Sequence, residues 1–124
     1  MREVAVVAAG GAIGAAARYA FGAWAADRFG AAFPWHTLVI NVGGAFLLGL
    51  LMALSAERGL LGPGWRIFAG VGVLGGFTTF STLAYESIRL VEQGSAAAGL
   101  ANMFGSGVAG LAAAVAGLAL GRLL

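Results

Sequence analysis

Apolar residues fill four stretches of the chain, each long enough to cross a membrane as a helix. The stretches cover about residues 4–26, 37–56, 67–90 and 96–120, separated by short segments that carry charged residues, glycine or proline. About 20 apolar residues cross a hydrocarbon core roughly 30 Å thick. The pattern therefore predicts an all-α integral membrane protein that consists of a single domain of four transmembrane helices.

The third stretch is interrupted near its middle by a polar, glycine-rich run, Gly75-Gly76-Phe77-Thr78-Thr79-Phe80-Ser81-Thr82. Two adjacent glycines weaken a helix, and the hydroxyl groups supply hydrogen-bond donors and acceptors. A helix inside a bilayer is expected to unwind only where protein, a cavity or an ion replaces its lost partners. We therefore expect the third helix to break at the glycine pair and to form a site suited to a small ion.

Composition narrows the class of protein. Of the 124 residues, 60% are hydrophobic and 10% are charged, and the mean hydropathy of +0.94 is too high for a soluble domain. The chain has no cysteine, which excludes disulfides and thiolate metal sites. All seven basic residues are arginines without a cluster, so no nucleic-acid partner is predicted. Neither a nucleophile–base pair nor a metal-ligand cluster is present to indicate an enzyme.

The first stretch carries a face of small residues with one arginine on it. Gly10, Gly14, Arg18 and Gly22 recur at every fourth position, which lets another helix approach closely. An arginine within a spanning helix costs roughly 3 kcal/mol on insertion scales. Arg18 either extends to the headgroup interface, as long basic side chains do, or attracts anions or orders the pore-lining helices. The sequence does not separate these interpretations.

The connections are predicted from charged and turn-forming residues. We expect a loop over residues 27–36, where Pro34 favours a break. His36 is the only histidine and has no second histidine or cysteine with which to share a metal, so we interpret it as an interfacial loop residue. The exit of the third stretch is expected to be a solvated helix end, carrying Glu86, Arg89 and Glu92.

Two other stretches carry polar side chains that need partners in lipid. Asn41, near the start of the second stretch, either joins helices through its amide or donates a hydrogen bond to a passing anion. Asn102 and Ser106 in the fourth stretch are four residues apart and therefore share a face of the helix. That face is either a packing seam or the lining of a pathway.

Three motifs together resemble a known family, the small Fluc (CrcB) fluoride channels. Their third helix carries a Gly-Gly-x-Thr-Thr-Phe-Ser-Thr run, which corresponds to residues 75–82, and the similarity extends to residues 11–19 (GAIGAAARY) and 41–49 (NVGGAFLLG). Order, spacing and length all agree over nearly the whole chain. The resemblance implies a multi-pass protein of the bacterial plasma (inner) membrane that conducts fluoride selectively and exports it passively, which relieves fluoride toxicity.

The resemblance also implies how the chain assembles. Members of the family form antiparallel homodimers from subunits inserted in both orientations, with a structural sodium ion at the dimer centre. By alignment, the backbone carbonyls of Gly75 and Thr78 would hold this ion. The arginines of this chain favour both termini in the cytoplasm only slightly, with Arg2, Arg58, Arg66 and Arg122 on that side against Arg28 and Arg89 opposite. A weak bias is what insertion in both orientations requires.

Fluoride is compact and strongly hydrated, so its pathway must replace water with several donors that do not trap it. The electropositive rim of the Phe80 ring could meet the anion edge-on. In the family, the residue matching Asn41 lines the pathway, the fourth helix adds a polar track, and a second phenylalanine stands where this chain has Leu83. The predicted pathway residues are Asn41, Thr79, Phe80, Ser81, Thr82, Leu83, Asn102 and Ser106.

Two other classes of membrane protein share part of this sequence pattern. A proton-coupled transporter similar to the small multidrug resistance family also has four short spans, but it uses a membrane-embedded carboxylate in the first span, where this chain has none. A membrane assembly factor without transport activity would explain the glycine-rich faces. It would not explain the polar break in the third stretch.

Overall fold

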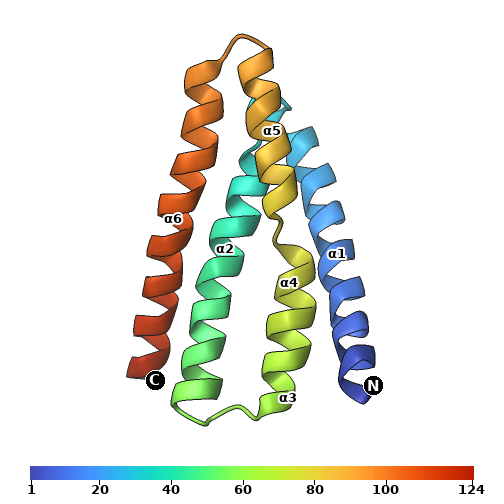
Figure 1. The fold of residues 1–124 in the computed structure, drawn as a ribbon, viewed down its shortest axis with the longest axis vertical. Coiled ribbons are helices and arrows are strands. Elements are labelled where there is room, and N and C mark those ends of the chain that lie inside the picture. Colours follow the sequence, from blue (N-terminus) through green and yellow to red (C-terminus); the bar gives the residue numbers. More distant parts are fainter.

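The computed structural model describes residues 1–124 as four long helical spans joined by short connections (Figure 1). All four are long and apolar enough to cross a membrane, so the predicted four-span helical membrane protein is confirmed. Both chain termini and the connection between the second and third spans lie at one end of the bundle. The spans are α1 (Arg2–Phe29), α2 (Trp35–Met52) continued by the π-helical η1 (Ala53–Glu57), the composite third span (Pro63–Glu92), and α6 (Ala96–Leu123).

The third span is broken, as predicted, but at a different place. It consists of α3 (Pro63–Trp65), the π-helical η2 (Arg66–Leu74), α4 (Gly75–Phe77) and α5 (Phe80–Glu92). Only Thr78 and Thr79 leave the helix, with extended ψ angles of 157° and 121°. The prediction of a break at the glycine pair is therefore wrong by three residues.

Gly76, the second glycine of the pair, packs against α1 instead of unwinding. Gly76 lies so close to α1 that a Cβ atom there would stand 2.6 Å from the carbonyl oxygen of Gly11. Gly14, across the same interface, leaves similarly little room beside Val73 and Phe77. Small residues let two backbones approach closely, which is the main source of helix association in lipid. Gly76 therefore lies in a helix packed so closely on α1 that it leaves no room for a side chain, whereas Gly75 is helical without such a contact.

The two halves of the third span pack on different neighbours. The half that precedes the break, η2 and α4, packs on α1, whereas α5 packs on α6. The helix α6 also packs along the length of α2 (Figure 1). The break thus lies where the third span changes its packing partner.

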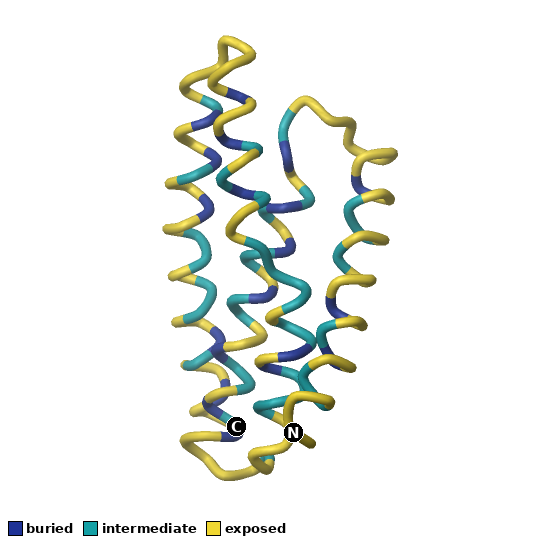
Figure 2. The backbone as a smooth tube through the Cα atoms, turned by 45° about the vertical axis from the view of Figure 1, so that its right-hand side comes forward, coloured by how far each residue is buried: buried dark blue, intermediate teal, exposed yellow.

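The interior of the chain is small and partly polar. Only 20 of the 124 residues are buried (Figure 2), and large apolar side chains cover the outside. This distribution is typical of a surface that faces lipid or another subunit. The buried polar residues are Thr37, Ser55, Ser87, Asn102 and Ser106.

The connection between the first two spans is shorter than predicted. Helix α1 continues through Asp27 to Phe29, and α2 begins at Trp35 directly after Pro34. Proline is tolerated immediately before a helix because its missing N–H needs no partner there. His36 therefore lies in the first turn of α2, and its assignment to a loop is wrong.

Candidate ion pathway at the break of the third span

The side chain of Asn41 on α2 binds the unwound backbone at the break. Its Nδ2 donates to the carbonyl oxygen of Thr79 at 2.9 Å, and its Oδ1 accepts from the Thr79 N–H at 2.8 Å. One amide thus satisfies both polar groups of a residue that has left the helix. Asn41 and the break, 38 residues apart in sequence, are brought together as predicted.

Two further side chains donate to backbone carbonyl groups just before the break. Arg18 on α1 donates from Nε to the carbonyl oxygen of Gly76 at 3.2 Å. Thr78 folds its hydroxyl back onto the carbonyl oxygen of Leu74 at 2.9 Å. Arg18 therefore points into the protein and orders the third span, which favours that interpretation over an interfacial arginine.

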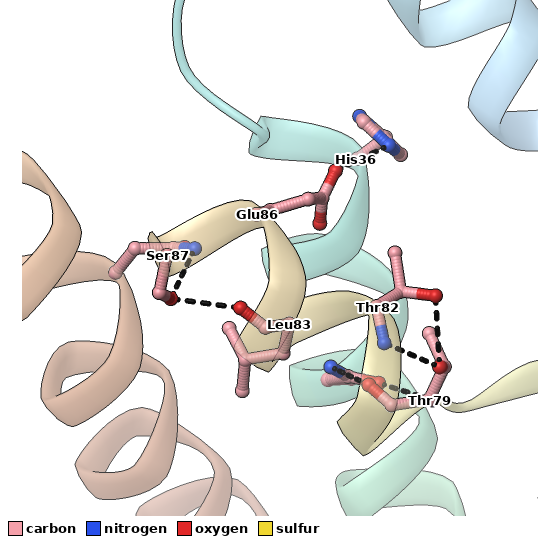
Figure 3. A network of polar contacts seen from close by, with 8 residues as sticks. His36, Thr79, Thr82, Leu83, Glu86 and Ser87 are labelled. Atoms are coloured by element: carbon pink, nitrogen blue, oxygen red, sulfur yellow. Dashed lines mark hydrogen bonds and ion pairs between the residues drawn. The ribbon is translucent and has the colours of Figure 1, made fainter. Parts of the chain in front are cut away.

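Thr79 also begins the helix that follows. Its Oγ1 accepts from the Thr82 N–H at 3.2 Å, which caps the start of α5 (Figure 3). The same hydroxyl donates to Thr82 Oγ1 at 3.1 Å and lies 3.4 Å from Ser81 Oγ. The predicted hydroxyl residues 79, 81 and 82 therefore form one local cluster.

A groove of about 400 Å³, here named the break groove, runs beside the unwound residues. Phe80 is 69% exposed in the single chain, whereas Leu83 is buried and only 6% exposed. No charged side chain lines this groove. The predicted site residues among its lining are Asn41, Gly75, Thr78, Thr79, Phe80, Leu83 and Ser106.

Two polar atoms at the break groove have no partner in the chain. The Oγ of Ser106 is buried and makes no hydrogen bond. The carbonyl oxygen of Thr78 accepts none either, since Thr78 joins the hydrogen-bond network only through its N–H and its hydroxyl. A buried hydroxyl without a partner, such as that of Ser106, is costly, and a ligand in the groove could satisfy both atoms.

A second hollow of about 360 Å³, the Arg18 cavity, lies on the other side of Thr79. Arg18, Thr82 and His36 line it, and Thr79 lines both hollows. The polar cluster of the break therefore separates a neutral groove from a cavity that carries a positive charge.

Asn102 lies away from both the break groove and the Arg18 cavity. It is 1% exposed between α5 and α6, and its Nδ2 donates to Ser87 Oγ at 3.0 Å. Ser87 in turn donates to the carbonyl oxygen of Leu83 at 2.8 Å. Neither Asn102 nor Ser81 lines the break groove or the Arg18 cavity.

The sequence interpretation missed Ser87, although a signal exists. Ser87 and Asn102 each stand seven residues from the turn at Gly94 and Ser95. Residues equally far from the turn of a helical hairpin face one another. Ser106 and Leu83 obey the same relation, being eleven residues from that turn, and both line the break groove.

The predicted solvated helix end is also partly wrong. The Nε2 atom of His36 lies 3.3 Å from Glu86 Oε2, and the two side chains are only 28% and 19% exposed (Figure 3). The packing of α5 against the start of α2 brings them together. Arg89 and Glu92 are exposed and 3.8 Å apart, as expected for solvated charges.

Comparison with known proteins places the chain in a family. Residues 5–118 match the model of the CrcB-like protein, Camphor Resistance (CrcB) family. The chain belongs to the CrcB family. This membership confirms the resemblance seen in the sequence motifs, and it covers all four spans.

Similar members of the CrcB family are named fluoride-specific ion channel FluC. One from a strain of Thermus thermophilus is 49% identical over 119 residues, which are 96% of this chain and 93% of that protein. One from Chloroflexus aurantiacus is 45% identical over 98% of this chain and 97% of the relative. Another from Agrobacterium fabrum is 45% identical over 100% and 99%. The similarity therefore extends across whole chains.

Proposed function

We propose that this chain is a fluoride-selective ion channel, not an enzyme, and that it lets fluoride leave the cell passively and so relieves fluoride toxicity. The full-length relatives named fluoride-specific ion channels support this function. The observation that carries it is the break groove, in which hydroxyl and amide groups and one aromatic ring meet without a charged side chain. Neutral donors can replace the water around a small anion without holding it too tightly.

Each proposed pathway residue has a chemical task. Asn41 keeps one N–H beyond its bond to Thr79, and Ser106 Oγ has no partner, so both can donate to fluoride. The exposed Phe80 ring offers its electropositive edge. Thr82 and Arg18 extend the pathway into the Arg18 cavity, where the guanidinium attracts anions. Asn102 is assigned to packing of α5 on α6 because its amide is bonded to Ser87.

The working channel is proposed to be an antiparallel homodimer. The break groove lies at the surface of one chain, and Phe80 and many large apolar residues are exposed around it. A second copy in the inverted orientation would close the groove and bury these residues. Such inverted pairing also puts the polar residues near the membrane midplane about an in-plane axis.

A structural sodium ion is proposed at the centre of this dimer. Gly75 and Thr78 both line the break groove, and the Thr78 carbonyl oxygen lacks a hydrogen bond. Carbonyl oxygens from an unwound helix are the ligands that sodium takes in membrane proteins. These residues therefore fit the ion, which would supply a positive charge and a bridge between subunits.

The proposed location is the bacterial plasma membrane, with both orientations present. The termini lie at the same end as the connection between the second and third spans (Figure 1), which puts four arginines at that end and two at the other. This difference is small for a rule that depends on the number of positive residues. Insertion in both orientations follows from such a weak bias.

The test is fluoride efflux from liposomes that contain only the purified protein. We expect rapid efflux that requires a potassium ionophore to balance charge, and that needs neither a proton gradient nor a cationic drug. Chloride-loaded liposomes serve as the control for selectivity and should show no comparable efflux. Proton-coupled exchange of a cationic drug without fluoride current would instead establish the multidrug-type transporter.

A further inference from the structure

His36 lies between the proposed pathway and a third hollow. This hollow of about 170 Å³, the loop cavity, is lined by Glu86, Arg89 and residues of the connection before α2, and His36 lines it too. His36 also lines the Arg18 cavity, which meets the break groove at Thr79. A row of three hollows therefore leads from the break to the end of the bundle that carries the connection at residues 30–34.

Glu86 places a negative charge in this row. Its Oε2 faces His36 at 3.3 Å, and its Oε1 is buried without any hydrogen-bond partner (Figure 3). A carboxylate near a membrane-spanning segment is costly unless it is paired. His36 is its only ion-pair partner. The charge at this mouth therefore depends on whether His36 carries a proton.

The other charged groups nearby are fixed. Arg18 on α1 is bonded to the third span, and Arg89 on α5 pairs with Glu92. Neither arginine forms an ion pair with Glu86.

The remaining elements carry few ionisable groups near the pair, of which Tyr19 on α1 lines the Arg18 cavity. Asp27 and Arg28 at the end of α1 are exposed and line none of the three hollows. The α6 helix has one charged residue, Arg122, which lies at the opposite end of the bundle. Histidine is the side chain that ordinarily changes charge between about pH 5 and 8.

We propose that the His36–Glu86 pair makes fluoride conduction depend on pH, with protonation of His36 increasing conduction. The inference rests on the fluoride-channel function proposed above. With His36 neutral, the Glu86 carboxylate repels fluoride at the mouth, and the local anion concentration falls. With His36 protonated, the pair is neutral and Arg18 attracts the anion unopposed.

The experiment measures fluoride efflux from liposomes of the wild-type protein at equal pH on both sides, from about pH 5.5 to 8.5. Protein-free liposomes correct for hydrogen fluoride that crosses the bilayer unaided. We expect the rate at the acidic end to exceed that at the alkaline end by roughly three- to tenfold. Added inert salt should reduce this ratio, because it screens the charge at an open mouth.

Two variants separate the charge mechanism from a structural role. Glu86→Gln should conduct, at every pH, at least as fast as the wild type does at the acidic end, because it removes the repelling charge. His36→Gln should conduct at the low, alkaline-end rate at every pH, because Glu86 then stays uncompensated. Glu92→Gln, which changes an exposed carboxylate on the same helix, should keep the wild-type pH profile.

The outcomes distinguish the inference from the function. Fluoride efflux at one rate across the pH range would overturn the inference and leave the channel function intact. Absence of fluoride efflux at every pH would overturn the function itself. If His36→Gln fails to fold, Glu86→Gln still decides, because alkaline-end efflux no faster than that of the wild type in that variant would contradict the role of the pair.

Discussion

At the break, single side chains make the hydrogen bonds that a continuous helix would otherwise make. Asn41 pairs with both backbone polar groups of Thr79, and Arg18 takes the carbonyl of Gly76. Each of these groups would cost several kcal/mol if left unsatisfied in hydrocarbon. The polar residues around the proposed pathway therefore have a structural role besides their proposed role in conduction, and substitutions must be designed to separate these roles.

Asn41→Asp is predicted to abolish most fluoride conduction while the dimer still assembles. The carboxylate cannot donate to the Thr79 carbonyl, and its negative charge repels fluoride. We expect efflux to fall by about tenfold or more, since the two losses together exceed about 1.4 kcal/mol. Liposome efflux measures conduction, and size-exclusion chromatography measures assembly. Unchanged flux in a correctly assembled variant would limit Asn41 to helix packing.

Phe80 and Leu83 are three residues apart at the start of α5 and both line the break groove. Leucine keeps the apolar bulk of the family's second phenylalanine but has no ring edge for an anion. If each of two pores is lined by Phe80 of one chain and Leu83 of the other, every pore keeps one aromatic edge. Each pore would then depend on a single aromatic ring.

Phe80→Ile is therefore predicted to reduce fluoride efflux by roughly tenfold, because the aromatic edge contact is lost while apolar volume remains. Leu83→Phe, the matched change at the neighbouring position, should leave a working channel with an altered rate, since the groove beside Leu83 can accept the ring. Both variants are compared with wild type by liposome efflux. Robust flux in Phe80→Ile would mean that hydroxyl and amide donors suffice.

Among the helical elements, sequence periodicity and length predicted the four spans but not the place of the break. The glycine pair at positions 75 and 76 has the lowest helix propensity in the span, yet both glycines are helical, and Gly76 packs closely on α1. Thr78 and Thr79 unwind instead, stabilised by an asparagine from another span. Local propensity cannot report such a partner, because it lies 38 residues away in sequence.

Residue type and the family resemblance together predict part of the candidate site. Asn41, Phe80 and Ser106 carry donors or a ring, the resemblance puts them in the pathway, and the fold brings them to one groove. The resemblance predicts Asn102 in the pathway too, but Asn102 faces Ser87, since helix rotation decides which of two polar residues four apart reaches a groove. The His36–Glu86 contact had no sequence signal, because it depends on how α2 and α5 cross.

The seam between α2 and α6 supplies a test at the element scale. A Cβ atom on Gly117 would clash with the carbonyl group of Phe46, whereas one on Gly105 of the same helix would meet nothing within 4 Å. Gly117→Ala is predicted to destabilise the protein by roughly 1–3 kcal/mol through overpacking. Gly105→Ala should be neutral or stabilising, because alanine favours helix. Tryptophan-monitored thermal unfolding in detergent compares them, and equal midpoints would contradict the close seam.

On the scale of the whole molecule, the single chain has three features that the proposed dimer would explain. Its outside is apolar, its break groove is open, and the groove holds a carbonyl oxygen without a partner. A lipid environment supplies no hydrogen bond to such a carbonyl. An inverted second copy and a cation between the two chains would resolve all three features together.

Sodium is accordingly predicted to stabilise the dimer rather than to be transported. The carbonyl oxygens of Gly75 and Thr78 from two chains would surround one ion at the symmetry axis, so binding couples directly to association. An ion that binds only the dimer stabilises it by about 2.7 kcal/mol at a hundred times its dissociation constant. Dimer dissociation is measured in detergent after exhaustive dialysis into sodium or into a large organic cation, with elemental analysis to establish that no ion is retained. Equal dissociation in the two buffers, in protein shown to be free of sodium, would remove the ion from the assembly and leave Thr78 to be satisfied by the partner subunit alone.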